Sequence, residues 1–254
     1  MKIIVRIILL IAGFAASWSA TAEKPGAGTL RAWESYVALA EQRIAAGHEG
    51  AAGTVRTEPA KQTRSDSIPV TDGLIHHATG AVFVPNISVA SVLRWMQRYD
   101  RHHRYFSEVA QSRQIARDGN TFRISYRIVR ANAFLAAHYN TDHTVVYRQH
   151  GAGRASSRSV ATRIAEIEHP GTTVEAELPV GNDRGYLWRL NSYWRFTEHD
   201  GGVVIECESI SLSRAIPFGL GWLLAAFVEA IPRDSLESTL VSVRDGIGAA
   251  PRDD

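Results

Sequence analysis

The chain has 254 residues, with 28 lysines and arginines against 26 aspartates and glutamates. This balance, with no basic run longer than Arg101 to Arg104, excludes the concentrated positive face that nucleic acid binding needs. The single cysteine, Cys207, excludes an intrachain disulfide, so the stability must come from packing.

The first 22 residues are typical of a secretory signal peptide. Lys2 and Arg6 give a basic start, an apolar core follows, and small residues precede the expected cleavage point. The apolar run is shorter than the roughly 20 residues that cross a bilayer, which favours cleavage after Ala22 over a retained anchor. A lipoprotein is not expected, because Cys207 is far from this point. The sequence therefore predicts an exported protein, periplasmic or secreted.

The mature chain is expected to begin with a helical extension. Apolar residues recur at spacings of three and four over residues 30–47, which predicts an amphipathic helix, and a polar linker follows. We assign residues 23–66 to this extension, residues 67–248 to one folded domain and residues 249–254 to a tail.

The folded domain is expected to open with a strand at 74–84 and a helix at 88–100, with Asn86 or Ser88 as the helix cap. The apolar period then becomes two, which indicates half-buried strands. Residues 172–183 are punctuated by proline and glycine and are read as a loop with room for one short strand. The further expected strands span residues 122–128, 131–140, 144–150 and 157–168.

The next two strands form a hairpin around the turn from His199 to Gly202, and its register can be predicted. Pairing Glu198 with Val203 places Arg195 opposite Glu206 and Trp194 opposite Cys207. A shift by one residue would lose both the charge pairing and the apolar pairing. The apolar face of this hairpin contains Trp188, Leu190, Trp194, Phe196, Ile205 and Cys207.

The C-terminal region predicts an apolar helix from about residue 217 that breaks or kinks at Pro232. A second segment from Ser235 carries a one-sided apolar stripe. We expect this helix to cover the apolar hairpin face. The stripe consists of Leu236, Leu240, Val243 and Ile247.

This order of elements resembles the helix-grip fold of the SRPBCC superfamily, which includes START lipid-transfer domains and polyketide cyclases. The runs GYLWRLNSYWRF (185–196), CESISLSR (207–214) and IPRDSL (231–236) are similar, more narrowly, to exported bacterial proteins of that superfamily. The resemblance implies an α+β fold in which a curved antiparallel sheet wraps around a long C-terminal helix, with an extra N-terminal helix. It also implies an apolar cavity, but no catalytic motif of the superfamily maps onto these positions.

The candidate ligand-binding residues come from the apolar hairpin face and its neighbours. Aromatic side chains line pockets and also fill cores, so the alternative to ligand binding is that these residues are plain core. Cys207 is read as an inert thiol, because no histidine adjoins it and glutamates flank it. The candidates are Tyr126, Trp188, Trp194, Phe196, Ile205, Cys207 and Trp222.

Two polar groups have alternative interpretations. The Arg195, Glu206, Tyr193 and Glu208 ladder is either a solvated face of ion pairs or a polar cavity wall where arginine would meet a ligand carboxylate. The histidine pairs at 76–77 and 102–103 have the residue types of a metal site. Adjacent side chains point to opposite faces of a strand, however, and those at 102–103 also diverge on a helix. No HExxH or comparable spacing occurs, so no metal is predicted, and no other cofactor is predicted either.

Three functions are considered, and the first two belong to different classes. The first is a non-catalytic cell-envelope protein that binds an apolar or amphipathic, lipid-like molecule between sheet and C-terminal helix; peripheral membrane contact and oligomeric state stay open. The second is a cyclase- or dehydratase-like enzyme that uses tyrosine, arginine and glutamate of the cavity wall for acid–base chemistry. A third is an interaction module whose N-terminal helix docks a partner.

Overall fold

The structure, a computed structural model, describes residues 24–49, 63–131, 136–215 and 221–249. For residues 48–49, 131 and 221–230 it describes the backbone alone. The predicted signal peptide, most of the predicted linker and nearly all of the predicted tail therefore lie outside the described residues.

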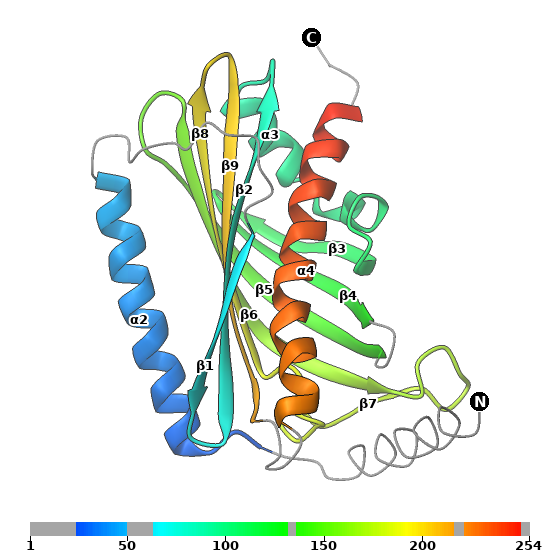
Figure 1. The fold of residues 1–254 in the computed structure, drawn as a ribbon. Helices are drawn as coiled ribbons and strands as arrows, with labels where there is room; N and C mark the ends of the chain where they lie inside the picture. The colour runs from blue at the N-terminus through cyan, green and yellow to red at the C-terminus, as the bar shows by residue number, and fades with distance from the viewer. Residues whose placement is uncertain (1–23, 50–62, 132–135, 216–220, 250–254) are drawn as a thin grey trace, which may run out of the picture.

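In the described part of the chain, nine strands form one curved antiparallel sheet (Figure 1). The strand order is β1-β2-β9-β8-β6-β5-β4-β3, with β7 paired to β6. The strands are β1 (Arg64–Val70), β2 (Gly73–Pro85), β3 (Val109–Asp118), β4 (Thr121–Ala131), β5 (Ala136–Gln149), β6 (Arg154–Glu168), β7 (Ala176–Glu177), β8 (Arg189–His199) and β9 (Gly202–Arg214).

Helices cover both faces of the sheet. Figure 1 shows α2 against one face and α4 against the other, which is the predicted α+β arrangement with an extra N-terminal helix. Among the described residues, no helix combines the length and apolar character that spanning a bilayer requires. The helical segments are α2 (Ala27–Glu49), α3 (Val89–Met96), the 3-10 helix η1 (Tyr99–Arg104) and α4 (Gly221–Ala249).

The predicted hairpin register is confirmed. Arg195 pairs with Glu206 and Trp194 with Cys207 across β8 and β9. The predicted cap of α3 is also confirmed, since the Ser88 side chain accepts the Ser91 backbone N–H at 3.3 Å.

The hairpin separates two apolar clusters. On the inner face, Phe196 and Ile205 are fully buried beside Val243 of α4. On the outer face, Ile210 and Leu212 pack with Trp33 of α2. Because successive side chains of a strand alternate between faces, α4 and α2 pack on opposite faces of the same two strands, β8 and β9.

Glycine lets α4 approach the sheet closely. A Cβ at Gly80 of β2 would lie 2.7 Å from Leu240 Cδ1 of α4, so the Leu240 side chain would have to shift to make room for it. Leu236 and Leu240 pack instead on Ala78 and Cys207. The predicted one-sided stripe of α4 is buried, as the sequence indicates.

Of the predicted break or kink at Pro232, the break is wrong, because α4 continues through this residue. Proline lacks the N–H that would bond back four residues, which costs roughly 3 kcal/mol or more in an exposed helix. The close packing of Leu236 and Leu240 on the sheet offsets this loss.

Two predicted strands are a single strand in the structure, and two strands of the structure were not predicted. Residues 131–140 and 144–150 were predicted as two strands, but a single strand, β5, spans Ala136–Gln149. The residues between the two predicted strands do not form a turn; Thr141 and His143 continue the strand with buried side chains. The strands β1 and β3 are missing from the prediction, because each lies at an edge of the sheet and is largely polar.

The helix α2 is held on the outer face by polar contacts as well as by Trp33. Tyr36 Oη lies 2.6 Å from His77 Nδ1. Glu41 accepts hydrogen bonds from Tyr193 Oη and Arg158 Nε, each at 2.7 Å. With the packing of Trp33 on β9, the N-terminal helix is therefore held against the domain by contacts from the strands β2, β6, β8 and β9.

Tyr193→Phe is expected to lower the free energy of unfolding by about 1–2 kcal/mol, because Glu41 and the buried Asn191 amide each lose a partner. Urea unfolding measures the change. Tyr105→Phe is the matched control: no hydrogen bond of the Tyr105 hydroxyl occurs in the described chain, so we expect a change within about 0.5 kcal/mol. Equal losses in both variants would contradict a stabilising role for this contact.

Candidate functional site

A cavity of about 170 Å³ lies between the inner face of the sheet and α4. Five strands, α4 and the segment from η1 to β3 supply its walls. The apolar part of the lining comes mainly from Met96, Phe106, Val109, Ile124, Ile128, Val145, Leu190, Trp194 and Leu236.

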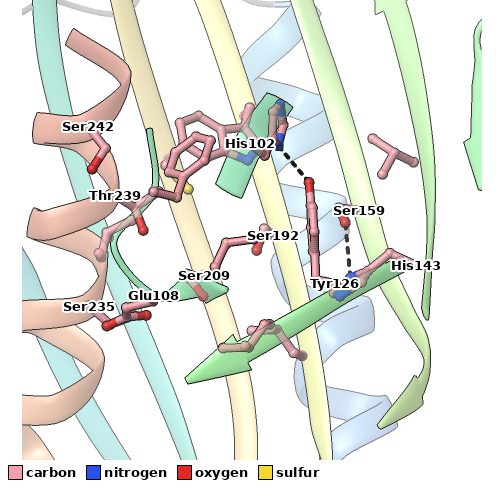
Figure 2. Close-up of a pocket in the computed structure, with 18 of the residues that line it drawn as sticks. His102, Glu108, Tyr126, His143, Ser159, Ser192, Ser209, Ser235, Thr239 and Ser242 are labelled. Carbon is pink, nitrogen blue, oxygen red and sulfur yellow. Dashed lines mark hydrogen bonds between the residues drawn. The ribbon is translucent and has the colours of Figure 1, made fainter. Parts of the chain in front are cut away.

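A row of serines crosses the floor of this cavity. Ser159 of β6 pairs with Ser192 of β8, which pairs with Ser209 of β9. Directly opposed side chains on neighbouring strands lie roughly 5 Å apart, so the three hydroxyls form one polar belt. Figure 2 shows them facing the cavity, and Ser157 and Ser211 add hydroxyls beside the belt.

Hydroxyls also line the opposite wall, on α4. Ser235, Thr239 and Ser242 follow spacings of four and three and therefore share one helix stripe (Figure 2). Ser235 donates a hydrogen bond to Glu108 Oε2 at 2.6 Å, and Ser238 Oγ lies 3.1 Å from Ser107 Oγ. These two contacts tie α4 to the segment that precedes β3.

The pair His102 and Tyr126 forms one side of the cavity. His102 Nε2 lies 2.9 Å from the Met96 carbonyl oxygen, which only accepts, so this nitrogen carries the proton. The other nitrogen, Nδ1, then accepts from Tyr126 Oη at 2.7 Å (Figure 2). Burial lowers the pKa of His102 to about 4 and raises the pKa of Tyr126 well above 10, so both are neutral at pH 7.

His143 is a second buried, neutral histidine in the lining. Its Nε2 lies 3.0 Å from Thr141 Oγ1, and its Nδ1 lies 3.4 Å from Ser159 Oγ at one end of the serine row (Figure 2). Burial lowers the pKa of His143 to about 4. The inner wall therefore presents neutral hydrogen-bonding groups rather than cations at this point.

The predicted site residues separate into four groups. Tyr126, Trp194 and Cys207 line the cavity. Phe196 and Ile205 lie deeper, fully buried in the core. The remaining two are treated below.

Trp188 was predicted on the apolar face of the hairpin, and this is wrong. It precedes β8 and packs with Trp33 and Leu212 on the outer face, beneath α2. The alternation rule does not extend beyond the end of a strand, which is why the prediction failed. Trp222 is in the first turn of α4, and its side chain lies outside the described residues.

The Arg195 ladder belongs to the outer face, so its interpretation as a cavity wall is wrong. Arg195 makes two hydrogen bonds to Glu206, at 2.6 and 2.8 Å. The alternative interpretation, a solvated face of ion pairs, fits Arg195 and Glu206, whose side chains are 41% and 36% exposed. The helix α2 covers part of this face, because Arg43 bonds Glu208 and Glu41 bonds Tyr193.

The adjacent histidines diverge in both pairs, on the strand β2 by alternation and on the helix η1 by helical rotation. His76 bonds Ser213 inside the sheet, whereas His77 faces Tyr36 of α2. His102 points to Tyr126 and His103 to Ser112. In the part of the chain that the structure describes, no three histidine, cysteine or acidic side chains gather in a group that could hold a metal ion.

The Cys207 thiol is poorly suited to act as a nucleophile. It is buried in contact with Leu236 and Leu240, and this burial raises the pKa of the thiol far above neutral pH. The prediction of an inert thiol agrees with this environment.

Sequence reasoning missed most polar groups of the cavity. The serine row and the hydroxyl stripe of α4 were not proposed, although one signal was available. Ser209 and Ser211 of β9, like Ser157 and Ser159 of β6, occur two residues apart and therefore share a face of their strand.

Neither a protein-family model nor a curated protein matches the sequence. Among solved structures, a STAR-related lipid transfer protein from Xanthomonas axonopodis is similar, with a TM-score of 0.50 and 13% identity over 72% of this chain and 98% of that one. A protein from Thermus thermophilus has a TM-score of 0.49 and 14% identity over 68% and 97% of the two chains. The Zhui aromatase/cyclase from a Streptomyces species has a TM-score of 0.44 and 9% identity over 68% and 94%.

At these identities the likeness concerns the fold. The chain has the helix-grip fold that the sequence resemblance implies, with the sheet curved around α4. This architecture is the one in which START-type lipid transfer proteins are built.

Proposed function

We propose that this protein binds an apolar or amphipathic, lipid-like small molecule in the cavity between the sheet and α4, without transforming it. The observation that carries the proposal is the mixed lining of a preformed cavity: apolar side chains such as Ile124 and Leu190 alternate with hydroxyls such as Ser159 and Ser192. Few precisely placed polar groups within an apolar wall are typical of ligand pockets. The lipid-transfer relative of the same fold supports it.

The size of the cavity narrows the ligand. A volume of about 170 Å³ holds far more than the roughly 15 Å³ that one water requires, yet it is below the roughly 300 Å³ at which drug-sized pockets begin. We therefore expect a compact molecule of a few rings, or one segment of a longer chain, to fill it.

The two histidines of the cavity wall favour binding over catalysis. Both ring nitrogens of His102 and of His143 are already engaged by protein groups. A base works best when its pKa is close to the working pH, and burial lowers the pKa of each of these histidines to about 4.

A cyclase- or dehydratase-like enzyme is the second candidate, and the buried Tyr126–His102 hydrogen bond favours it. A titratable pair with strongly shifted pKa values in a cavity is a common feature of active sites. Native mass spectrometry distinguishes the two functions: a bound molecule that is recovered unchanged supports binding, and one recovered with the mass of a dehydrated product supports catalysis.

We further propose that the protein works outside the cytoplasm. The signal-peptide pattern before Ala22 supports this location. The mass of the protein purified from the periplasm or the medium tests it, with Glu23 as the expected first residue.

Filling the cavity tests binding directly. We expect Ser192→Phe to weaken binding of the neutral fluorescent probe N-phenyl-1-naphthylamine by about 10-fold or more, because the ring occupies the floor of the cavity. Ser125→Phe is the matched control: this serine lies on the same sheet between two lining residues and points to the opposite face. Fluorescence titration measures both affinities.

In this experiment the control should keep its affinity within about 2-fold of the wild-type protein. Ser192→Leu replaces the first variant if the phenylalanine prevents folding. A wild-type protein that does not bind the probe, or equal affinities in the two phenylalanine variants, would remove the cavity as the binding site.

A further inference from the structure

Among the described residues, one cation of the cavity lining, Arg130, has no hydrogen-bond or ion-pair partner. Arg130 follows Ile124, Tyr126 and Ile128 at spacings of two on β4, so its side chain shares their inner face. Its Nε is buried and makes no hydrogen bond. Across the described residues, no hydrogen bond or ion pair joins Arg130 to another side chain.

The groups around Arg130 do not neutralise it. Burial, and then the nearby Arg130 charge, lower the pKa of His76 to about 4, so this histidine is neutral. Its ring nitrogens lie 3.1 Å from Ser67 Oγ and 3.0 Å from Ser213 Oγ. The pKa of Tyr139 is raised by burial well above 10, so this neighbour is uncharged as well.

The carboxylates on this side of the sheet bond other groups. Asp183 accepts from the Gly185 backbone N–H at 2.7 Å, and Glu168 accepts from Arg184 Nη2 at 3.1 Å. Glu166, which pairs with Tyr139 across β5 and β6, accepts from Arg184 Nη1 at 2.7 Å and from the Arg184 backbone N–H at 3.0 Å. Glu108 is the only acidic residue of the lining within the described chain, and it accepts from Ser235. A partly buried arginine with no counter-ion is costly unless something else supplies the charge.

We propose that Arg130 binds a carboxylate of the ligand, an assignment that rests on the proposed function and makes the ligand an amphipathic monoanion. Arginine recognises carboxylates through paired N–H donors. A single cation matches a single negative charge, whereas a phosphate monoester would carry a second charge next to Glu108 with no cation to match it. The apolar body then lies against Ile128 and Leu190, and the serine row contacts its remaining polar groups.

The test compares two ligands of nearly the same shape, one with a carboxylate that carries a charge and only accepts hydrogen bonds, the other with a neutral amide. 2-Naphthoate and 2-naphthamide have the same two-ring body, and isothermal titration calorimetry measures the affinity of each. We expect the wild-type protein to prefer naphthoate by about 10-fold or more, since a hydrogen-bonded charge contributes that much. Arg130→Met should remove this preference and leave naphthamide affinity within about 2-fold, while Arg130→Lys should keep part of it.

The possible failures are distinguishable. If N-phenyl-1-naphthylamine binds but naphthoate does not bind more tightly than naphthamide, the assignment of Arg130 falls and the proposed function stands. If Arg130→Met weakens both naphthalene ligands equally, the arginine has a structural role and the assignment also falls. Tighter binding of 2-naphthyl phosphate than of naphthoate would overturn the carboxylate in favour of a dianion. If the wild-type protein binds none of the probes, both proposals fail.

Discussion

Acidification from pH 8 to pH 4 is expected to lower the free energy of unfolding by roughly 6 kcal/mol, a large part of the stability of a typical domain. Burial lowers the pKa of His76, His102 and His143 from 6.5 to about 4. Between pH 6.5 and pH 4 these histidines bind protons in the unfolded chain but not in the folded chain, so the free energy of unfolding falls as the pH falls. Each histidine contributes about 3 kcal/mol to this loss.

One buried carboxyl group acts in the opposite direction. Burial raises the pKa of Asp183 from 3.8 to about 6, although the Gly185 N–H donates to it at 2.7 Å. The folded chain therefore binds this proton before the unfolded chain does, and stability rises by about 3 kcal/mol as the pH falls from 6 towards 4. The roughly 6 kcal/mol given above is the net of these opposing effects.

Urea unfolding at a series of pH values from 8 to 4 measures the loss. Above pH 7 these four groups predict a flat profile, and below it a fall. His143→Gln should reduce the slope by up to about 1.4 kcal/mol per pH unit, whereas His103→Gln, at an exposed position, should preserve it. A stability that does not change between pH 8 and 5 would contradict the burial of three neutral histidines.

Replacing Phe196 by alanine should lower the free energy of unfolding by about 3–5 kcal/mol. The ring is fully buried and stacks parallel to Trp194, with centroids 6.4 Å apart. It packs in the cluster that joins β8 to α3 and α4. The substitution removes this packing and leaves a void that the surrounding sheet cannot close.

The neighbouring residue provides the control for this substitution. Thr197 follows Phe196 on β8 and points to the other face, so Thr197→Ala should change stability by about 0.5 kcal/mol. Urea unfolding again gives both values. A loss below about 1.5 kcal/mol for Phe196→Ala, together with tighter probe binding, would show that the ring lines an open cavity instead of forming the core.

The hairpin could be predicted from sequence because its information is local. The turn at residues 199–202 fixes the pairing, and Arg195 opposite Glu206 and Trp194 opposite Cys207 select the same register. The covering of the inner face by α4 follows from the periodic stripe of Leu236 and Leu240. Local patterns of this kind agree with the fold and can be recognised in the sequence without knowledge of the fold.

The cavity could not be predicted in the same way. Inward serines such as Ser192 and Ser209 resemble solvent-facing positions in a sequence, because alternation cannot tell a polar inner wall from an exposed face. The outer-face ladder shows the same limit from the other side. From the sequence, Arg195 and Glu206 could belong to a solvated face or to a cavity wall, and only the fold shows which face they occupy and places α2 beside it. Arg130 has no local signal, since its lack of partners is a property of the whole cavity.

The central claim, that a small molecule occupies the space between the sheet and α4, is tested most directly by methyl NMR during titration with N-phenyl-1-naphthylamine. The account predicts shifts for Ile124, Ile128 and Val145, which line the cavity, and none for Ile75 and Leu212, which lie under α2. Shifts confined to the methyl groups under α2, or an unchanged spectrum at saturating probe, would contradict it.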